Sequence, residues 1–153
     1  MSRAAIAMSD AEAAAFLAEE RVLVVATIGR DGWPHLMPLW YVVRHGTLWA
    51  WTYGKSQKVR NLERDARCTL QVEAGESYDQ LRGAMLKAEA TIHRDLDTVT
   101  RVGMELTGRY SGSEPDAGMR EAFERQAVKR VALEFHERHR ATWDHRKLGS
   151  GTY

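Results

Sequence analysis

The segment from Trp51 to Leu62 carries the residue types best suited to chemistry in this chain. An apolar stretch ends there, a turn follows, and Ser56 precedes a helix-forming run. Ser56 is an expected N-cap, so the free backbone N–H groups of the helix and the positive end of its dipole lie beside it. Lys55, Lys58 and Arg60 add three cations around the same turn. This combination predicts an anion site of the kind that binds phosphate. The alternative is a capped surface helix whose lysines face water.

Two histidine patterns could also do chemistry. His136 and His139 flank Glu137-Arg138, but residues three apart in a strand point to opposite faces and cannot share a metal ion. The spacing also differs from the H-E-x-x-H helix motif, so a solvated strand end is the simpler interpretation and no metal site is predicted. His35 could donate a proton because its unperturbed pKa lies near neutrality. Alternatively, it only satisfies the end of a strand.

The elements that must position these residues form a single domain over the 153 residues, with residues 144–153 expected to be a flexible C-terminal tail. The net charge is +1, and the run 60–67 mixes acids with bases, so no nucleic-acid partner is expected. Cys68 is the only cysteine, which fits a small core residue in a reducing compartment. No apolar run approaches the roughly 18 residues of a membrane span, and no signal peptide is evident, so we expect a cytoplasmic protein.

Hydrophobic patterns predict six strands and four helices. The strands are expected at 21–28, 35–43, 47–52, 68–74, 83–93 and 130–137, and the helices at 9–20, 56–64, 96–109 and 115–127. Only turns join the first three strands, which excludes a parallel doubly wound sheet because such a sheet needs crossover helices. The prediction is an α+β fold built on an antiparallel β-barrel. Strand 47–52 is bulky on both faces, so we expect one face to meet a ligand or partner.

The order of these elements resembles the split β-barrel flavin-binding superfamily. That superfamily includes pyridoxamine 5'-phosphate oxidases and the reductases that depend on the deazaflavin coenzyme F420. The similarity covers nearly the whole chain, and its most specific pieces are Ala-Thr-Ile-Gly-Arg-Asp-Gly-Trp-Pro-His at 26–35, Ser-Gln-Lys-Val-Arg-Asn-Leu at 56–62 and Leu-Arg-Gly at 81–83. The resemblance implies a six-stranded antiparallel split β-barrel.

The resemblance also implies a homodimer that binds its cofactor in a groove between two barrels. The end of the second strand and the end of the third would line the ring system, and the Ser-x-Lys turn would take the phosphate. A tryptophan after the last strand would help complete the partner's site. Carried onto this chain, the cofactor-binding residues are Leu39, Trp40, Tyr41, Trp51, Thr52, Lys55, Ser56, Gln57, Lys58, Arg60 and Trp143, with His145 and Arg146 beside the last.

The resemblance favours coenzyme F420 over FMN, because Lys55 and Arg60 suit the acidic glutamyl tail of the deazaflavin and the full set of basic residues that grips pyridoxal phosphate is absent. The leading hypothesis is an oxidoreductase that transfers a hydride from F420 to a small unsaturated substrate. No side chain is clearly a general acid, and His35 is the candidate. The alternatives are an FMN-dependent enzyme like the pyridoxamine phosphate oxidases, a non-catalytic carrier of the cofactor, and a dimeric interaction module without a cofactor.

Overall fold

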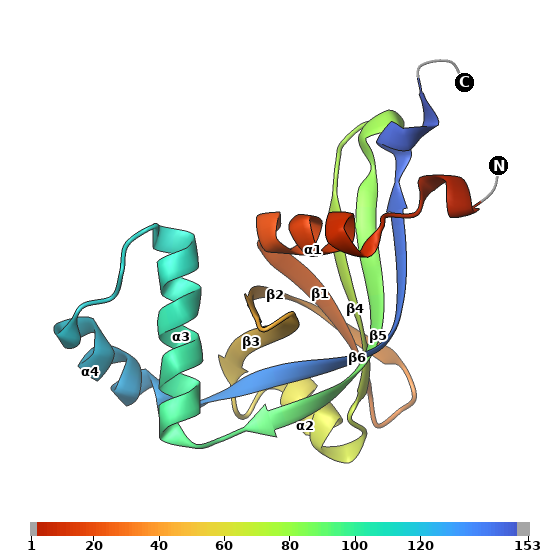
Figure 1. Cartoon of the computed structure of the whole chain (residues 1–153). Helices are drawn as coiled ribbons and strands as arrows, with labels where there is room; N and C mark the ends of the chain where they lie inside the picture. The colour runs from red at the N-terminus through yellow and green to blue at the C-terminus, as the bar shows by residue number, and fades with distance from the viewer. Residues whose placement is uncertain (1–2, 150–153) are drawn as a thin grey trace.

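The protein is a six-stranded antiparallel barrel, seen in a computed structural model that describes residues 3–149 (Figure 1). The barrel is closed in the order β1-β2-β3-β6-β5-β4. Its strands are β1 (Val22–Ile28), β2 (Pro34–Arg44), β3 (Thr47–Tyr53), β4 (Arg67–Ala74), β5 (Arg82–His93) and β6 (Arg130–Asp144). The predicted strands and the α+β barrel are therefore confirmed. Within the described residues, no helix combines the length and apolar character needed to cross a bilayer.

Apolar side chains at alternate strand positions fill the barrel, and two helices pack against this core. α1 (Asp10–Glu19) begins with a capping box, in which the Glu12 N–H donates to Ser9 Oγ at 3.2 Å and the Ser9 N–H donates to the Glu12 carboxylate at 2.7 Å. α2 (Gln57–Arg64) lies at the lower end of the barrel in Figure 1. The two helices contribute Phe16, Leu17, Val59 and Leu62 to the same apolar cluster as the inward side chains of the strands.

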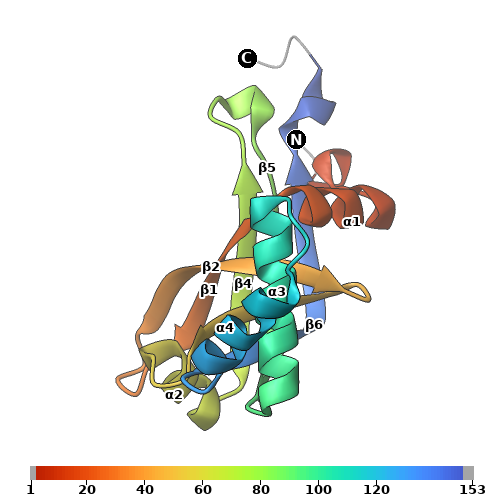
Figure 2. The ribbon, with the colours of Figure 1, turned by 90° about the vertical axis from the view of Figure 1, so that its left-hand side faces the viewer.

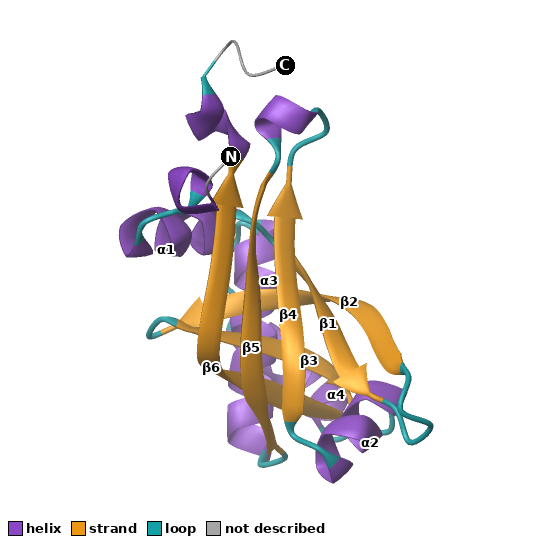
Figure 3. Ribbon diagram, turned by 90° about the vertical axis from the view of Figure 1, so that its right-hand side faces the viewer, coloured by secondary structure: helices purple, strands orange, loops and turns teal. Residues whose placement is uncertain are grey.

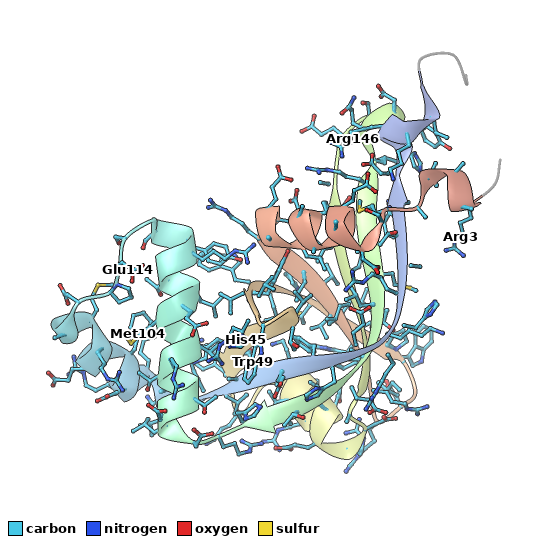
Figure 4. The ribbon with its side chains drawn as sticks, viewed as in Figure 1. Arg3, His45, Trp49, Met104, Glu114 and Arg146 are labelled. Atoms are coloured by element: carbon cyan, nitrogen blue, oxygen red, sulfur yellow. The ribbon has the colours of Figure 1, made fainter. Side chains whose placement is uncertain are left out.

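α3 (Leu96–Ser111) and α4 (Ala117–Ala127) stand side by side outside the barrel (Figure 2). They pack on the outer face of β2, β3 and β6, where Trp49 of β3 points toward α3 (Figure 4). The outer face of β3 is thus covered by helices of the same chain. α4 begins at Ala117, two residues later than predicted: Asp116 is the N-cap, and its carboxylate accepts from the Met119 N–H at 2.9 Å.

β4, β5 and β6 extend past the barrel as a long arm (Figure 3). β6 does not end at Glu137 as predicted but pairs with β5 to the register of Arg82 and Asp144. Two 3-10 helices, η2 (Tyr78–Gln80) and η3 (His145–Leu148), lie at the tip of the arm. In the predicted flexible tail, Asp144 thus ends β6 and residues 145–148 form η3. Residues 150–153 lie outside the described residues, and the flexibility of the tail stays a prediction.

Candidate functional site

The two strands that would line a cofactor diverge where the sequence predicted a groove. Residues 34–40 of β2 pair with β1, and only residues 41–44 of β2 pair with β3. Residues 51–53 of β3 pair with β6 alone. Both strands therefore present backbone edges without a second strand partner along this stretch, and α2 begins four residues after β3 ends. Such edges can hydrogen-bond to a planar ligand as they would to another strand.

A buried cation lies at the bottom of this split. Lys58, in the first turn of α2, is only 7% exposed, and its Nζ donates to Thr52 Oγ1 at 3.1 Å. Thr52 is buried at the end of β3. No ion pair joins Lys58 to an acidic side chain among residues 3–149. Burial lowers the pKa of Lys58, as expected when a charge is removed from water without a counter-charge.

Ser56 is the N-cap of α2, as predicted, but its side chain does not make the expected capping bond. Its Oγ is buried and has no hydrogen-bond partner in the described part of the chain. A buried hydroxyl without a partner is unfavourable unless a ligand or water satisfies it. We define the phosphate corner as Ser56 Oγ, Lys58 Nζ and the first backbone N–H groups of α2. All three features favour an anion.

The surface beside the phosphate corner is polar and hollowed. A hollow of about 500 Å³ lies between the β1–β2 turn and α2, and a second of about 670 Å³ adjoins it, since both include Arg30 and Gln57. The first is lined by Gly29, Arg30, Asp31, Trp33, Pro34, His35, Gln57 and Asn61, and the second by Arg30, Gln57, Arg60, Glu63 and Arg64. Lys55 and Arg60 are exposed, and His35 Nδ1 is buried with no hydrogen-bond partner among the described residues.

A side-chain network that the sequence did not reveal holds α2 against β1. Asn61 Nδ2 donates to Thr27 Oγ1 at 3.0 Å, and Gln57 Nε2 donates to Asn61 Oδ1 at 2.8 Å. Both Asn61 and Thr27 are buried. Asn61 thus fixes the side chain of Gln57, one of the predicted cofactor-binding residues. An uncharged polar residue on the inward face of a short helix was the available signal.

At the other end of the split, neighbouring residues of β2 point to opposite faces. Leu39 packs partly into the barrel core. The Trp40 ring is 58% exposed and stacks on Tyr110 of α3, with centroids 4.2 Å apart and planes 8° from parallel. Tyr41 is fully buried, its hydroxyl donates to the Leu17 carbonyl at 2.6 Å, and burial raises the pKa of Tyr41. The Tyr41 side chain thus faces the core, and a contact of Tyr41 with a cofactor ring stays a prediction for its backbone.

Trp51 also has a different environment from the one expected. The Trp51 ring lies against α3 and α4, with its centroid 5.8 Å from the centroid of the Phe123 ring. The Arg130 guanidinium lies 4.2 Å from the centroid of the Trp51 ring. A Cβ added at Gly103 would come within 2.9 Å of Trp51 Cζ2, so a glycine is required for the close approach of α3. The helical pair, rather than the split, surrounds this indole. Its backbone still belongs to the edge of β3 that has no second partner.

Trp143 lies far from the phosphate corner of its own chain. It pairs with Gly83 near the tip of the arm, where a Cβ on Gly83 would come within 2.3 Å of the indole. The same tip carries Arg146 (Figure 4), whose guanidinium donates to the Asp144 carboxylate at 2.6 Å and holds the pKa of Asp144 below its usual range. Any role of Trp143 at a cofactor site therefore requires a second chain and stays a prediction.

The remaining reactive side chains have ordinary surroundings. His136 Nε2 lies 2.9 Å from Thr91 Oγ1, and residues 3–149 contain no group of three or more potential ligands arranged to hold a metal ion. Cys68 is buried among apolar side chains, and burial raises its pKa to about 12. A thiol with such a pKa is almost entirely protonated at neutral pH and is a poor nucleophile.

Comparison with known proteins identifies the family and agrees with the fold. The sequence model of the family described as pyridoxamine 5'-phosphate oxidase matches residues 9–139. A conserved hypothetical protein from Mycobacterium tuberculosis is 39% identical, with a TM-score of 0.91 over 100% of this chain and 95% of that one.

More distant structures share the fold. An F420 reductase is 20% identical, with a TM-score of 0.65 over 82% of this chain and 93% of its own. An FAD-binding protein from Mesorhizobium loti is 18% identical, with a TM-score of 0.68 over 88% of this chain and 94% of its own. At these identities the likeness is one of fold alone. No curated protein sequence matches this chain.

Proposed function

Because the chain belongs to the pyridoxamine 5'-phosphate oxidase family, within a superfamily whose members bind flavins or deazaflavins, we propose that it is an oxidoreductase. Its proposed cofactor is coenzyme F420, and its proposed reaction is hydride transfer to a small unsaturated substrate. The bound deazaflavin would supply the hydride chemistry, and the protein would bind, orient and shield it.

One observation carries the proposal: at the N-terminus of α2, and within residues 3–149, a buried lysine has no counter-charge and a buried serine hydroxyl has no hydrogen-bond partner. These residues fit a phosphate, because the phosphate would supply both the missing counter-charge and the missing hydrogen-bond acceptor. The position is also appropriate. The phosphate corner lies at the open end of the split, beyond the end of β3, and β2 and β3 diverge at Tyr41 and Ala50, so a ring system attached to the phosphate can lie along the unpaired strand edges.

The charges outside the phosphate corner favour F420 over FMN. The adjoining hollow is lined by Arg30, Arg60 and Arg64, with Glu63 as its only acidic residue. Glu63 already forms an ion pair with Arg94. Net positive charge therefore remains where a chain of carboxylates beyond the phosphate would lie. FMN ends at its phosphate and would leave these cations unused.

The side chains around the split have separable roles in this proposal. The Trp40–Tyr110 stack presents a large flat surface where the pairing of β2 with β1 ends and would limit the space for the substrate. His35 lines the hollow beside Gln57 rather than the stretch near Trp40. We therefore assign His35 to hydrogen bonding with the ligand near the phosphate corner, not to protonation of the substrate.

The proposed assembly is a homodimer in which two barrels enclose the cofactor. Side chains exposed along β2 and the preceding turn include Trp33 (75%), Leu36 (57%), Met37 (41%) and Trp40 (58%). Leu36 and Trp40 lie four residues apart and therefore share one face of β2, and exposed apolar side chains grouped on one face indicate a partner or ligand surface. A second copy of the chain would cover this surface and could bring Trp143 from its arm to the split.

The test is a titration followed by turnover. Purified protein is titrated separately with F420 and FMN, and loss of ligand fluorescence or a change in its polarisation gives each affinity. The reduced form of the tighter ligand is then mixed with enone or quinone acceptors, and recovery of the oxidised absorbance is followed. Tighter binding of F420 and protein-dependent acceleration would support the proposal. Tight binding without acceleration of any acceptor would instead support a carrier, and tighter binding of FMN would contradict the choice of cofactor.

The arginine-lined hollow can be tested separately. Arg60→Gln should weaken F420 about tenfold while leaving FMN affinity unchanged, because only the glutamyl tail reaches beyond the phosphate. Arg101→Gln is the matched control, since Arg101 is an exposed arginine of α3 that pairs with Asp97. An equal loss of both ligands in Arg60→Gln would show that Arg60 acts on the shared phosphate and not on the tail.

A further inference from the structure

Arg130 is held between two aromatic rings without an anionic partner. It is the first residue of β6 and pairs in register with Tyr53 of β3. Its guanidinium lies 4.2 Å from the centroid of Trp51 and 4.1 Å from that of Tyr53. No hydrogen bond or ion pair satisfies its N–H groups within residues 3–149. Stacking on aromatic faces fixes the plane of the guanidinium while leaving its donors available.

The guanidinium lines a hollow of about 390 Å³ between β3 and the end of α4, which we call the Arg130 hollow. Its lining consists of Tyr53, Ala122, Arg125, Gln126, Lys129 and Arg130. Three of these residues are cationic and none is acidic. Arg125 pairs with Glu121 at 2.8 Å, whereas Lys129 has no acidic partner in the described chain. The Tyr53 ring is 57% exposed and supplies an apolar wall.

The surroundings of the Arg130 hollow are already ordered. Trp51 lies against Phe123, and the approach of α3 at Gly103 leaves no room for even a methyl group beside it. The Trp51 Nε1 atom is buried and has no hydrogen-bond partner in the described chain. The Gly54 N–H donates to the Lys129 carbonyl at 3.0 Å, which fixes the loop after Tyr53. A ligand would therefore meet a rigid surface and lose little binding energy to reorganisation.

We propose that the Arg130 hollow binds a small planar carboxylate, with the carboxylate on Arg130 and Lys129 and the aromatic or conjugated body against Tyr53. The planar fork of a guanidinium matches the two oxygens of a carboxylate, and the tyrosine ring favours a flat apolar body over a compact inorganic ion. This site is separate from the phosphate corner and does not depend on the identity of the cofactor.

The test uses benzoate as the probe and acetate as its non-aromatic counterpart, with the indole N–H resonance of Trp51 as the readout. Trp51→Phe identifies that resonance. Benzoate should shift it saturably and bind more tightly than acetate. Arg130→Gln should weaken benzoate about tenfold or more, as loss of a charge-assisted contact predicts. Lys129→Gln, which leaves the stacked guanidinium in place, should cause a smaller loss.

Two further variants locate the probe. Arg101→Gln removes an arginine elsewhere on α3 and should leave benzoate binding unchanged. Lys58→Ala removes the cation of the phosphate corner and should also leave it unchanged. A wild-type shift that never saturates, or equal affinities in the wild type and Arg130→Gln, would overturn the inference. Loss of benzoate binding in Lys58→Ala would place the probe at the phosphate corner and would overturn it as well, without contradicting the proposed function.

Discussion

At the scale of single residues, we expect Lys58 to lower the free energy of unfolding and to strengthen cofactor binding. A charged side chain that is 7% exposed and bonded only to a threonine hydroxyl is poorly compensated. Lys58→Met should therefore raise the free energy of unfolding of the protein without its cofactor by about 1–3 kcal/mol. The same change should weaken cofactor binding by about 1.5–3 kcal/mol, the scale of a hydrogen bond to a charged group. Urea denaturation and equilibrium titration measure the two effects; a loss of stability together with unchanged affinity would contradict the phosphate corner.

The protonation of Lys58 gives a second test. Burial lowers the pKa of Lys58 in the folded protein below the ordinary value of 10.5. Between the folded-state pKa and 10.5, the unfolded chain therefore binds more protons than the folded one. Stability contributed through this group must then rise with pH across that window. The free energy of unfolding of the wild type is expected to be lower than that of Lys58→Met, and this difference should shrink as pH is raised from neutrality toward 10.5. Urea denaturation of both proteins over this range measures the change, and a constant difference would show that Lys58 is not desolvated.

Sequence reasoning found Lys58 but could not orient the large side chains of β2 at the other end of the split. Leu39, Trp40 and Tyr41 are three large side chains in succession, so alternation alone does not say which faces the core. Tyr41 is buried because its hydroxyl can reach the Leu17 carbonyl at the end of α1. That contact joins positions distant in the chain, and no local pattern announces it. The unpaired Oγ of Ser56 was equally unpredictable, because capping preference describes the residue type and not the rotamer.

At the scale of elements, two glycines of α3 should respond oppositely to the same substitution. Gly103→Ala would place a methyl group 2.9 Å from the Trp51 ring, and overpacking of this kind costs about 1–3 kcal/mol. Gly108→Ala adds a methyl group whose nearest neighbour is 3.7 Å away. It should stabilise the protein by about 0.4–1 kcal/mol, because alanine loses less conformational freedom in a helix. Thermal or urea denaturation of both variants provides the comparison, and destabilisation by both would contradict the packing at Trp51.

The elements also show what a one-dimensional pattern omits. The short strands joined by turns were predictable because apolar alternation and turn residues coincide there. The second half of β6 was missed because the run from His136 to Arg140 is polar on both faces, as a solvated end would be. Pairing with β5 continues through that run, with a register shift between Lys87 and Ala88. Gly83 opposite Trp143 was the one signal for the extension, since a large ring often covers a strand glycine.

At the scale of the whole molecule, the decisive prediction concerns assembly. The edge of β2 at residues 34–40 has no second strand partner within residues 3–149, so a single chain builds only one wall of a groove. We therefore expect a homodimer, with a solution mass of twice the 17.4 kDa chain. Leu36→Glu places a charge among the exposed apolar residues of β2, where Leu36 is 57% exposed in a single chain. Sedimentation equilibrium should show this variant as a monomer, because an uncompensated charge is costly to bury.

The control for that prediction is Val128→Glu, which introduces the same charge at a valine that is 76% exposed beyond the end of α4. This variant should remain a dimer with unchanged cofactor affinity. Circular dichroism should show both variants folded, because neither side chain is buried in the single chain. Loss of the dimer in Leu36→Glu should be accompanied by loss of cofactor affinity, since the second barrel would supply the other wall of the groove. A wild-type monomer that binds F420 tightly would refute this geometry, because the split between β2 and β3 would then be a complete site by itself.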